Sequence, residues 1–507
     1  MMAGSAHAGG EEAPGWPTRG WPMSTPEEQG MDSNALAKLV EFGTMRSFDS
    51  LLVARHGTIV AEAYWAPYSA DILHAIHSST KAVVGTLTGI ALKDGLLDNT
   101  DHRAMDFFRD RAIANVDDRK QALTIQNLLD MTSGLDWREP LDGRPDSVIA
   151  MARTPDWLEF ILDRPMASAP GDVFNYDSGN PHLLSAILTK VTGTSAERYA
   201  ETKLFAPLGI ANAHWDRDPQ GLSIGGFGLY LRPRDMAKIG YLYLREGEWE
   251  GRRLLPAAWI DRVSHATVNM NASWEPALRY SNFFWALPDK HVFMANGYHC
   301  QLIMVFPELD IVAVTTARDF CPLGRLSDLI ANAVKSEAAL APDTEGTARL
   351  TQEIREVATE EPTSVGAVPE MAVALAAKAY EFPRNVMNIK SLALTSAGPS
   401  PHLELHTYDR DGPPPGFSVP IGPPGAGFSV PIGLDGLYRT VKSSDGEVQA
   451  LRGAWRDDHT FVIDRLLVGQ GQPPERWTLA FDGDKLHVRG ELARGNVVSI
   501  VGESRGG

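Results

Sequence analysis

The chain has 507 residues, of which 43% are hydrophobic and 22% are charged, a composition typical of soluble globular proteins with a sizeable core. At about 150 residues per domain, this length predicts roughly three domains, or two unequal ones. The formal net charge of −17 argues against nucleic acid or an anionic membrane as the main partner, because both repel an acidic surface.

The N-terminal segment, residues 1–22, is rich in Gly, Ala and Pro, and we expect it to be disordered or loosely docked. It has neither the basic n-region nor the apolar h-region of a signal peptide. No apolar run in the chain approaches the ~18 residues that a membrane span needs. Cys300 and Cys321, the only cysteines, cannot form a disulfide framework. These features favour a cytoplasmic protein without a membrane partner.

Residues 23–340 alternate between short strand and helix signals, which we interpret as one catalytic domain. In chain order, the sequence predicts two strands about His56–Gly57, a helix from Ser78 to a C-cap at Gly95, a helix from Asn180 to Gly193, and two strands about Pro307–Asp310. Helices mixed with adjacent strands indicate the α+β class, with helices packed on an antiparallel sheet.

Beyond this region the texture of the sequence changes. Residues 341–375 are rich in Glu, Thr, Ala and Pro and are predicted to be a linker or connecting helix. Residues 376–507 show short strands and turns, including a hairpin at Asp482–Gly483. The motif GFSVPIG occurs at 416–422 and 427–433, a local loop duplication. We expect a small accessory all-β domain, a barrel or sandwich without catalytic groups of its own.

Ser78 and Lys81 lie three residues apart at the start of the predicted helix. Positions i and i+3 share one helix face, so the two side chains can meet without long-range assembly. A serine hydroxyl is a weak nucleophile that needs a base within hydrogen-bond reach, and the helix N-terminus favours an oxyanion beside it. The pair therefore predicts nucleophilic catalysis, although a Ser-x-x-Lys motif is expected about once by chance in a chain of this length.

Two competing catalytic motifs are missing from the sequence. It contains no His-Glu-x-x-His helix and no phosphate-binding Gly-x-x-x-x-Gly-Lys-Ser/Thr. His74 and His77 have the spacing of metal ligands but lack nearby Cys, Asp or further His residues. We expect no metal and no organic cofactor, and we expect both histidines to pack beside the nucleophile.

Two later segments complete the pattern. Tyr176 and Ser178 form a Tyr-x-Ser pair on the loop that enters the Asn180 helix, where a phenol near an ammonium can have a lowered pKa and relay a proton. Farther on, Gly297 precedes an apolar strand and would let the backbone approach a ligand closely. The amide of the following Tyr298 can form an oxyanion hole together with the amide of Ser78.

In this order and spacing, Ser-x-x-Lys, Tyr-x-Ser and the glycine-led strand resemble the motifs of the serine β-lactamase/penicillin-binding-protein superfamily. The spacing is most similar to its class C-like branch of esterases, D-aminopeptidases and 6-aminohexanoate-dimer hydrolases, over about residues 22–340. The resemblance implies a β-lactamase-like fold, in which helices flank an antiparallel sheet beside a helical subdomain. It also implies that Ser78 is acylated, with Lys81 and Tyr176 jointly serving as base and proton relay.

The departures from this family pattern concern substrate binding. Ala295-Asn296-Gly297 stands where β-lactamases have Lys-Thr-Gly, and alanine offers no charge to a substrate carboxylate. Ser178 takes the place of a common asparagine. The stretch GYHCQ is similar to Gly-x-His-Gly-Gln of the 6-aminohexanoate-dimer hydrolase-like members, so His299 matches their histidine and Cys300 replaces a glycine. A strand histidine satisfied by its neighbours is an equal alternative for His299.

These observations predict a serine hydrolase of esters or small amides that binds its substrate with Ser178, Asn296, Gly297 and His299. An acyltransferase that uses the same acyl-enzyme, and a non-catalytic sensor or binding protein on the same fold, remain alternatives. The partner expected is a small molecule, and a homo-oligomer is possible. Aromatic residues that suit an apolar acyl pocket, or that could equally belong to the core, stand in the loops of residues 136–163 and 269–289: Trp137, Trp157, Trp274, Phe283, Phe284 and Trp285.

Overall fold

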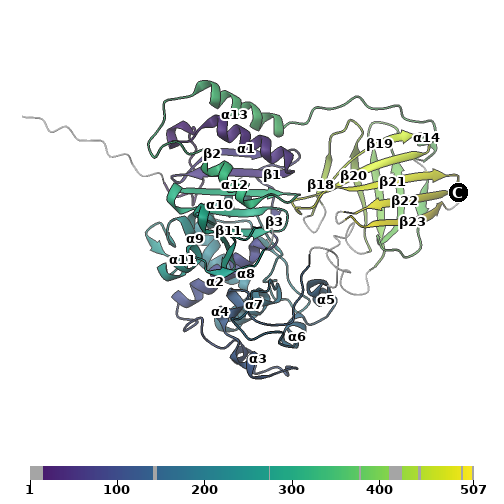
Figure 1. Cartoon of the computed structure of the whole chain (residues 1–507). Helices are drawn as coiled ribbons and strands as arrows, with labels where there is room; N and C mark the ends of the chain where they lie inside the picture. Colours follow the sequence, from purple (N-terminus) through teal and green to yellow (C-terminus); the bar gives the residue numbers. More distant parts are fainter. Residues whose placement is uncertain are drawn as a thin grey trace, which may run out of the picture.

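Distant parts of the chain meet in one antiparallel sheet, which is the frame of the larger unit (Figure 1). The computed structural model describes residues 15–140, 146–272, 275–375, 378–409, 425–442, 447–492 and 495–504. Within these residues the sheet has eight strands, in the spatial order β2 (Thr58–Tyr64), β1 (Phe48–Arg55), β13 (Ile311–Ala317), β12 (Gln301–Phe306), β11 (Val292–Gly297), β10 (Phe284–Leu287), β9 (Arg279–Ser281) and β8 (Val268–Asn269). The predicted hairpins about His56–Gly57 and Pro307–Asp310 are confirmed.

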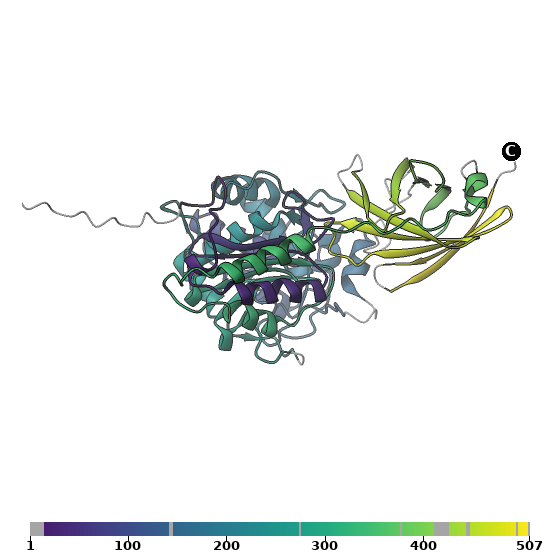
Figure 2. The ribbon, with the colours of Figure 1, turned by 90° about the horizontal axis from the view of Figure 1, so that it is seen from above.

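Helices cover both faces of this sheet. Figures 1 and 2 show α1 and α13 lying across one face, and α2 and α10 against the other. The covering helices are α1 (Ser33–Met45), α12 (Leu323–Ala331) and α13 (Thr344–Val357) on the first face, and α2 (Ser79–Lys93), α10 (Pro233–Leu244) and α11 (Ala257–Ser264) on the second. This is the α+β architecture predicted from the sequence. None of the described helices is both long and apolar enough to cross a membrane.

A lobe of mostly short helices packs beneath α2 and contributes one wall of the candidate site (Figure 1). Its longest helix, α7, contacts α2, α4, α6 and α8. The lobe contains η2 (Ala104–Phe108), α3 (Asp118–Ala122), α4 (Ile125–Leu129), α5 (Ser147–Ala152), α6 (Trp157–Leu162), α7 (Gly179–Thr192), α8 (Ala196–Ala200), η3 (Glu201–Phe205) and α9 (Ala206–Leu208). Small elements complete the larger unit: η1 (Glu27–Gln29), β3 (His74–Ala75), β4 (His214–Trp215), β5 (Leu229–Leu231), β6 (Glu248–Trp249), β7 (Arg252–Arg253), η4 (Pro288–Lys290) and η5 (Pro307–Leu309).

The structure shifts some of the predicted boundaries. α7 begins at Gly179 with Ser178 as its N-cap, so the predicted cap at Asn180 is two residues late. Of the N-terminal 22 residues, those from Gly15 onward are described, and Trp16 and Trp21 pack against Tyr241. α13, inside the segment predicted to be a linker or connecting helix, packs along α1.

The C-terminal strands form a barrel. The described residues place its strands in the order β17 (Gly427–Gly433), β16 (His402–Thr407), β15 (Ile389–Thr395), β14 (Ala379–Glu381), β23 (Val497–Ser504), β22 (Lys485–Glu491), β21 (Glu475–Asp482), β20 (Thr460–Val468), β19 (Val448–Asp457) and β18 (Arg439–Lys442). Pairing of β17 with β19 closes a ring of nine of these strands, which leaves β18 outside it. Closure pairs the backbone hydrogen-bonding groups that the edge strands of an open sheet would expose. A short helix, α14 (Met371–Leu375), precedes the barrel.

Two sequence predictions fall in this barrel. The Asp482–Gly483 hairpin is confirmed, since β21 and β22 pair from Asp482 to Lys485. The second GFSVPIG copy is strand β17, whereas the first, at 416–422, lies outside the described residues.

An apolar cluster joins the barrel to the larger unit. Tyr68 and the half-buried Ile72 pack against side chains of β19 and β20, namely Ala450, Leu466 and Val468. Leu466 and Ala450 are fully buried there. Because these barrel side chains point away from the barrel interior, their burial depends on the contact between the two units.

Candidate active site

Ser78 stands at the N-cap of α2, but its side chain does not cap the helix. Instead, the Lys81 Nζ lies 2.9 Å from the Ser78 Oγ and 2.8 Å from the carbonyl oxygen of Gly226. Lys81 is 1% exposed. The turn of helix that the sequence predicted therefore brings Ser78 and Lys81, the candidate nucleophile and base, into contact, and the carbonyl of Gly226, which no motif pointed to, accepts a hydrogen bond from the lysine.

Tyr176 closes the other side of this pair. Its side chain is hydrogen-bonded to Ser78, and its ring centroid lies 4.8 Å from the Lys81 Nζ. Trp285 packs edge-on against the Tyr176 ring, with centroids 6.1 Å apart. The structure thus brings together the three residues that the sequence assigned to acyl transfer.

Burial sets the protonation states at the site. It lowers the pKa of Lys81 to about 8, against the opposing charges of Glu139 and Asp177. Burial and the Glu139 carboxylate raise the pKa of Tyr176 well above its usual range, although the hydrogen bond to Ser78 acts in the other direction. The sequence-based expectation of a lowered phenol pKa is therefore wrong, because burial and the Glu139 charge outweigh the effect of the hydrogen bond to Ser78. These shifts favour the neutral phenol of Tyr176 and let a fraction of the Lys81 amine be neutral near neutral pH.

Glu139 is a functional candidate that the sequence reasoning missed. Its Oε1 accepts from the Ser178 Oγ at 2.7 Å, and its Oε2 accepts from the Ser178 backbone amide and from the Trp137 Nε1, each at 3.0 Å. Ser178 is thus held by a carboxylate at the start of α7. No spacing rule links positions 139 and 178, since the loop and the helix meet only in the folded chain.

The end of strand β11 lies against the segment that precedes Ser78. A Cβ on Gly297 would lie 2.2 Å from the backbone oxygen of Ile76, so only glycine permits this approach. Tyr298 follows directly, and its ring lies 6.0 Å from that of His77. Asn296 is half-buried, whereas Ala295 is fully buried. Gly297 ends β11 and precedes the apolar strand β12, as expected, but its close neighbour is the Ile76 backbone; the approach to a ligand stays a prediction.

His299 and Cys300 form the turn between β11 and β12 rather than part of a strand. Both have left-handed backbone conformations, with φ of 57° and 61°, so Cys300 adopts a conformation that glycine would favour. His299 packs against Phe320 with centroids 4.8 Å apart. His299 lies outside the β11–β12 ladder, so it is not a strand histidine, but the alternative of a histidine satisfied by its neighbours is supported by the 2.8 Å contact of its Nδ1 with the Gly471 oxygen.

Cys300 and Cys321 form a disulfide bond across 21 residues. Two cysteines without a motif give no sequence signal that they pair. Their number excludes only a framework of several disulfide bonds. The bond ties the β11–β12 turn to the segment that follows β13. Disulfides are rare in the cytosol and persist in oxidising compartments, so this bond argues against the cytoplasmic location expected from the sequence.

His74 and His77 do not share a common ligand position. His74 is buried and stacks on Tyr68, and burial lowers its pKa to about 3. The His77 Nε2 lies 3.0 Å from the backbone oxygen of Gln470 in the barrel. Among the described residues, no group of three or more His, Cys, Asp or Glu side chains is arranged to hold a metal ion.

Of the aromatic residues expected to line the acyl pocket, Trp285 borders the site through Tyr176. The other described residues of this set, Trp137, Trp157, Phe283 and Phe284, are buried, and of these the Trp137 Nε1 contacts Glu139 beside Ser178. Trp274 lies outside the described residues.

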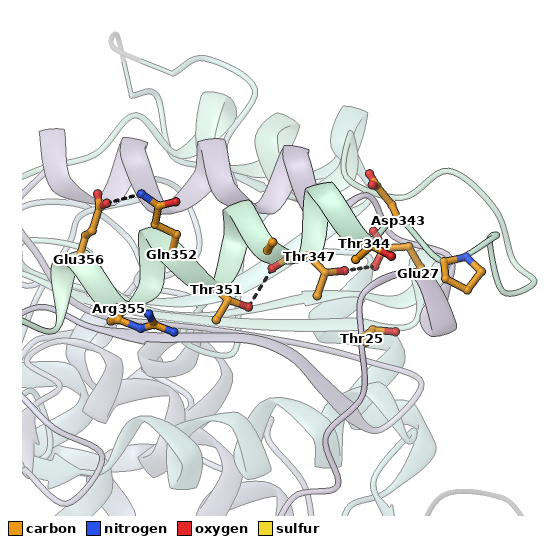
Figure 3. A pocket seen from close by; sticks show the side chains of 11 residues that line it. Thr25, Glu27, Asp343, Thr344, Thr347, Thr351, Gln352, Arg355 and Glu356 are labelled. Atoms are coloured by element: carbon orange, nitrogen blue, oxygen red, sulfur yellow. Dashed lines mark hydrogen bonds between the residues drawn. The ribbon is translucent and has the colours of Figure 1, made fainter.

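A separate groove lies between η1 and α13 (Figure 3). Glu27, its buried carboxylate, accepts hydrogen bonds from Ser33 and Thr347. The groove is on the sheet face covered by α13, opposite the face that carries α2. These hydrogen bonds satisfy the Glu27 carboxylate. Ser78, Lys81 and Tyr176 are not among the residues that line the groove.

Comparison with known proteins places these residues in a family. Residues 46–333 match the beta-lactamase family model, which covers more than half of the chain. The chain belongs to the beta-lactamase family. The match includes Ser78, Lys81, Tyr176 and the end of β11, which supports the resemblance drawn from the three motifs.

The relatives of this beta-lactamase family chain include hydrolases. A 6-aminohexanoate-dimer hydrolase of Paenarthrobacter ureafaciens is 25% identical over 285 residues, which span 52% of this chain and 71% of the relative. A Bacillus anthracis protein provisionally designated a 6-aminohexanoate-dimer hydrolase has a similar structure, with a TM-score of 0.50 and 19% identity over 69% of this chain and 90% of its own. EstCE1, a hydrolase with promiscuous acyltransferase activity, gives a TM-score of 0.51 at 17% identity over 60% of this chain and 99% of its own.

Proposed function

We propose that the protein is a serine hydrolase that cleaves esters or small amides through a covalent acyl-enzyme on Ser78. The observation that carries this proposal is the Lys81 Nζ, buried and 2.9 Å from the Ser78 Oγ, with its pKa lowered to about 8. A neutral amine at this distance is a competent general base for a serine nucleophile. The hydrolase relative at 25% identity supports the same class of reaction.

The proposed reaction has two halves. Lys81 removes the proton of the Ser78 hydroxyl, and the Oγ attacks the substrate carbonyl to form a tetrahedral intermediate. The backbone amides of Ser78 and Tyr298 stabilise its oxyanion. Tyr176 protonates the leaving group as its phenol is reprotonated from Lys81, and the acyl group stays on Ser78. Water then attacks the ester and restores the hydroxyl; an alcohol or amine in the place of water would make the same enzyme an acyltransferase.

The substrate class follows from the charges at the site. Ser178, Asn296, Gly297 and His299 are the proposed substrate-binding residues, and none of them carries the fixed positive charge that a carboxylate-bearing β-lactam requires. A charge-assisted hydrogen bond contributes roughly 1.5–3 kcal/mol, so its loss weakens β-lactam capture by about tenfold to a hundredfold. We expect poor nitrocefin hydrolysis beside ready hydrolysis of short-chain p-nitrophenyl esters.

Active-site labelling tests the proposal. A fluorophosphonate probe should modify Ser78, located by peptide mapping, and Ser78→Ala should lose both labelling and ester turnover. Lys81→Ala should lower turnover by about 10²–10⁴-fold, the contribution of a positioned base. Lys93→Ala, at the exposed end of the same helix, is the matched control and should keep wild-type turnover. Labelling at another serine, with Ser78→Ala still active, would overturn the assignment.

A further inference from the structure

The barrel reaches the candidate active site through the loop between β20 and β21, residues 469–474. Three consecutive carbonyl oxygens of this loop bond to the larger unit. The Gly469 oxygen accepts from the amide of Ala75 at 2.6 Å. The Gln470 oxygen lies 3.0 Å from the His77 Nε2, and the Gly471 oxygen lies 2.8 Å from the His299 Nδ1.

These contacts define which ring nitrogen of each histidine carries a proton. A backbone carbonyl can only accept, so His77 donates from Nε2 and His299 donates from Nδ1. The two rings are held by adjacent carbonyls of one loop, and both donors come from the larger unit. The barrel therefore fixes the orientation of two imidazoles that belong to another part of the chain.

Both histidines are direct neighbours of the proposed oxyanion donors. His77 precedes Ser78, and His299 follows Tyr298. Both have left-handed backbones, with φ of 46° and 57°. Non-glycine residues persist in such conformations where surrounding contacts hold them. The hydrogen bond from the loop to each histidine side chain is therefore placed to hold the backbone that orients the neighbouring amide, of Ser78 or of Tyr298.

We propose that the β20–β21 loop of the barrel is a positioning element of the active site: its Gln470 and Gly471 carbonyls clamp His77 and His299 and thereby keep the Ser78 and Tyr298 amides aligned on the oxyanion. This inference rests on the proposed acyl-enzyme function and extends it to the C-terminal barrel. The barrel is then required for turnover although it supplies no group that reacts.

Gly471 offers a direct way to displace the loop. It has a φ of +59°, and a Cβ added there would lie 2.7 Å from the Gln301 Nε2 and 3.0 Å from the His77 Nε2. Gln301 cannot give way easily, because its Nε2 donates to the carbonyls of His299 and Ala317. Gly483, in the β21–β22 turn, has the same φ of +59° but nothing within 4 Å of such a Cβ.

The experiment compares Gly471→Ala with Gly483→Ala in the full-length protein, using p-nitrophenyl butyrate hydrolysis and the rate at which a fluorophosphonate labels Ser78. Both variants carry the same backbone strain, but Gly471→Ala alone pushes the loop off the histidines. We expect kcat/KM of Gly471→Ala to fall by on the order of 10²-fold, mainly through kcat, because misplacement of a reacting geometry by about 1 Å has that effect. Labelling of Ser78 should slow in parallel, while Gly483→Ala keeps wild-type rates.

A second series reads the two hydrogen bonds directly. The side-chain nitrogen of Asn takes the place of a histidine Nδ1, and that of Gln takes the place of Nε2. We therefore expect His77→Gln to exceed His77→Asn in kcat/KM, and His299→Asn to exceed His299→Gln. A residue with only a packing role would not show opposite preferences at the two positions. This series also decides the question if Gly471→Ala fails to fold.

Ser78→Ala, measured beside these variants, separates the two proposals. If Ser78→Ala is inactive while Gly471→Ala and Gly483→Ala have equal kcat/KM, the acyl-enzyme function stands and the loop proposal is overturned. Equal activity of Asn and Gln at both histidine positions would also overturn it. If Ser78→Ala retains turnover, the proposed function falls, and the loop proposal falls with it.

Discussion

Lys81 is the residue whose protonation state limits the proposed reaction. Burial favours the neutral amine over the ammonium and lowers its pKa to about 8. Because the neutral form is the base, kcat/KM should rise with pH up to about 8, then level off, and fall by about tenfold per pH unit below that range. The measurement is ester hydrolysis from about pH 6 to about pH 10 at subsaturating substrate. A flat profile over this range would remove Lys81 as the base.

Glu139 should tune this profile through its charge. The Glu139 carboxylate favours the ammonium form of Lys81, and so opposes the effect of burial on the Lys81 pKa. Glu139→Gln removes the charge, so the Lys81 pKa should fall further and the rising limb of the kcat/KM profile should move to lower pH. Glu308→Gln, on the exposed turn η5 at the far end of β12, is the control and should leave the limb in place. Movement of the limb to higher pH in Glu139→Gln would contradict this account.

At the residue scale, local spacing predicted the parts of the site that lie within one helical turn or one motif. Ser78 and Lys81 meet because positions i and i+3 share a helix face. Glu139 could not be found in this way, since its contact with Ser178 joins a loop to a helix start 39 residues away. The raised Tyr176 pKa likewise depends on burial, which spacing does not reveal.

At the scale of elements, the Cys300–Cys321 bond is a covalent constraint on the β11–β12 turn. Closing a loop of this length removes entropy from the unfolded chain, and such bonds typically contribute about 2–4 kcal/mol. Cys300→Ala combined with Cys321→Ala should therefore lower the free energy of unfolding by about 2–4 kcal/mol in urea titrations. A reductant should lower the stability of the wild type towards that of the double variant.

The control for this prediction is the double variant itself, whose unfolding midpoint should not respond to the reductant. A wild type with the same midpoint in oxidising and reducing buffer would show that the bond contributes nothing to stability.

The sequence predicted helices and hairpins correctly where the signal was a hydrophobic periodicity or a turn motif. The apolar run after Ser78 and the Asp482–Gly483 turn both gave elements with nearly the observed bounds. The predicted start of a helix was wrong where tertiary packing determines it. α7 starts at Gly179, because Ser178 is held by Glu139 from outside the helix. The pairing of β17 with β19, which closes the barrel, is a long-range contact that period-two alternation cannot reveal.

For the whole molecule, the contact between barrel and sheet is the feature that sequence could least predict. The sequence indicated an accessory all-β region after residue 375, without catalytic groups of its own. The contacts of His77 with Gln470 join residues 393 positions apart. Only the packing of the two units against each other, through Tyr68 and Leu466 among others, brings such residues together.

The same contact predicts that barrel docking and turnover are coupled. Leu466 and Leu479 are both fully buried on neighbouring strands of the barrel, but Leu466 packs on Tyr68 of the larger unit, whereas Leu479 packs in the barrel interior. Truncation of a buried leucine to alanine costs about 2–5 kcal/mol at either site, through lost burial and the cavity left behind. Leu466→Ala also loosens the base of the β20–β21 loop, so its kcat/KM should fall even at temperatures where the protein stays folded.

Leu479→Ala should lose a comparable amount of stability and keep the wild-type kcat/KM under the same conditions, because the face that contacts Tyr68 is unchanged. The measurements are urea unfolding for stability and ester hydrolysis well below the melting temperature of both variants. Equal kcat/KM for Leu466→Ala and wild type would mean that the interface carries stability alone. A loss of kcat/KM in Leu479→Ala as large as in Leu466→Ala would mean that barrel stability in general, rather than docking on the larger unit, controls the active site.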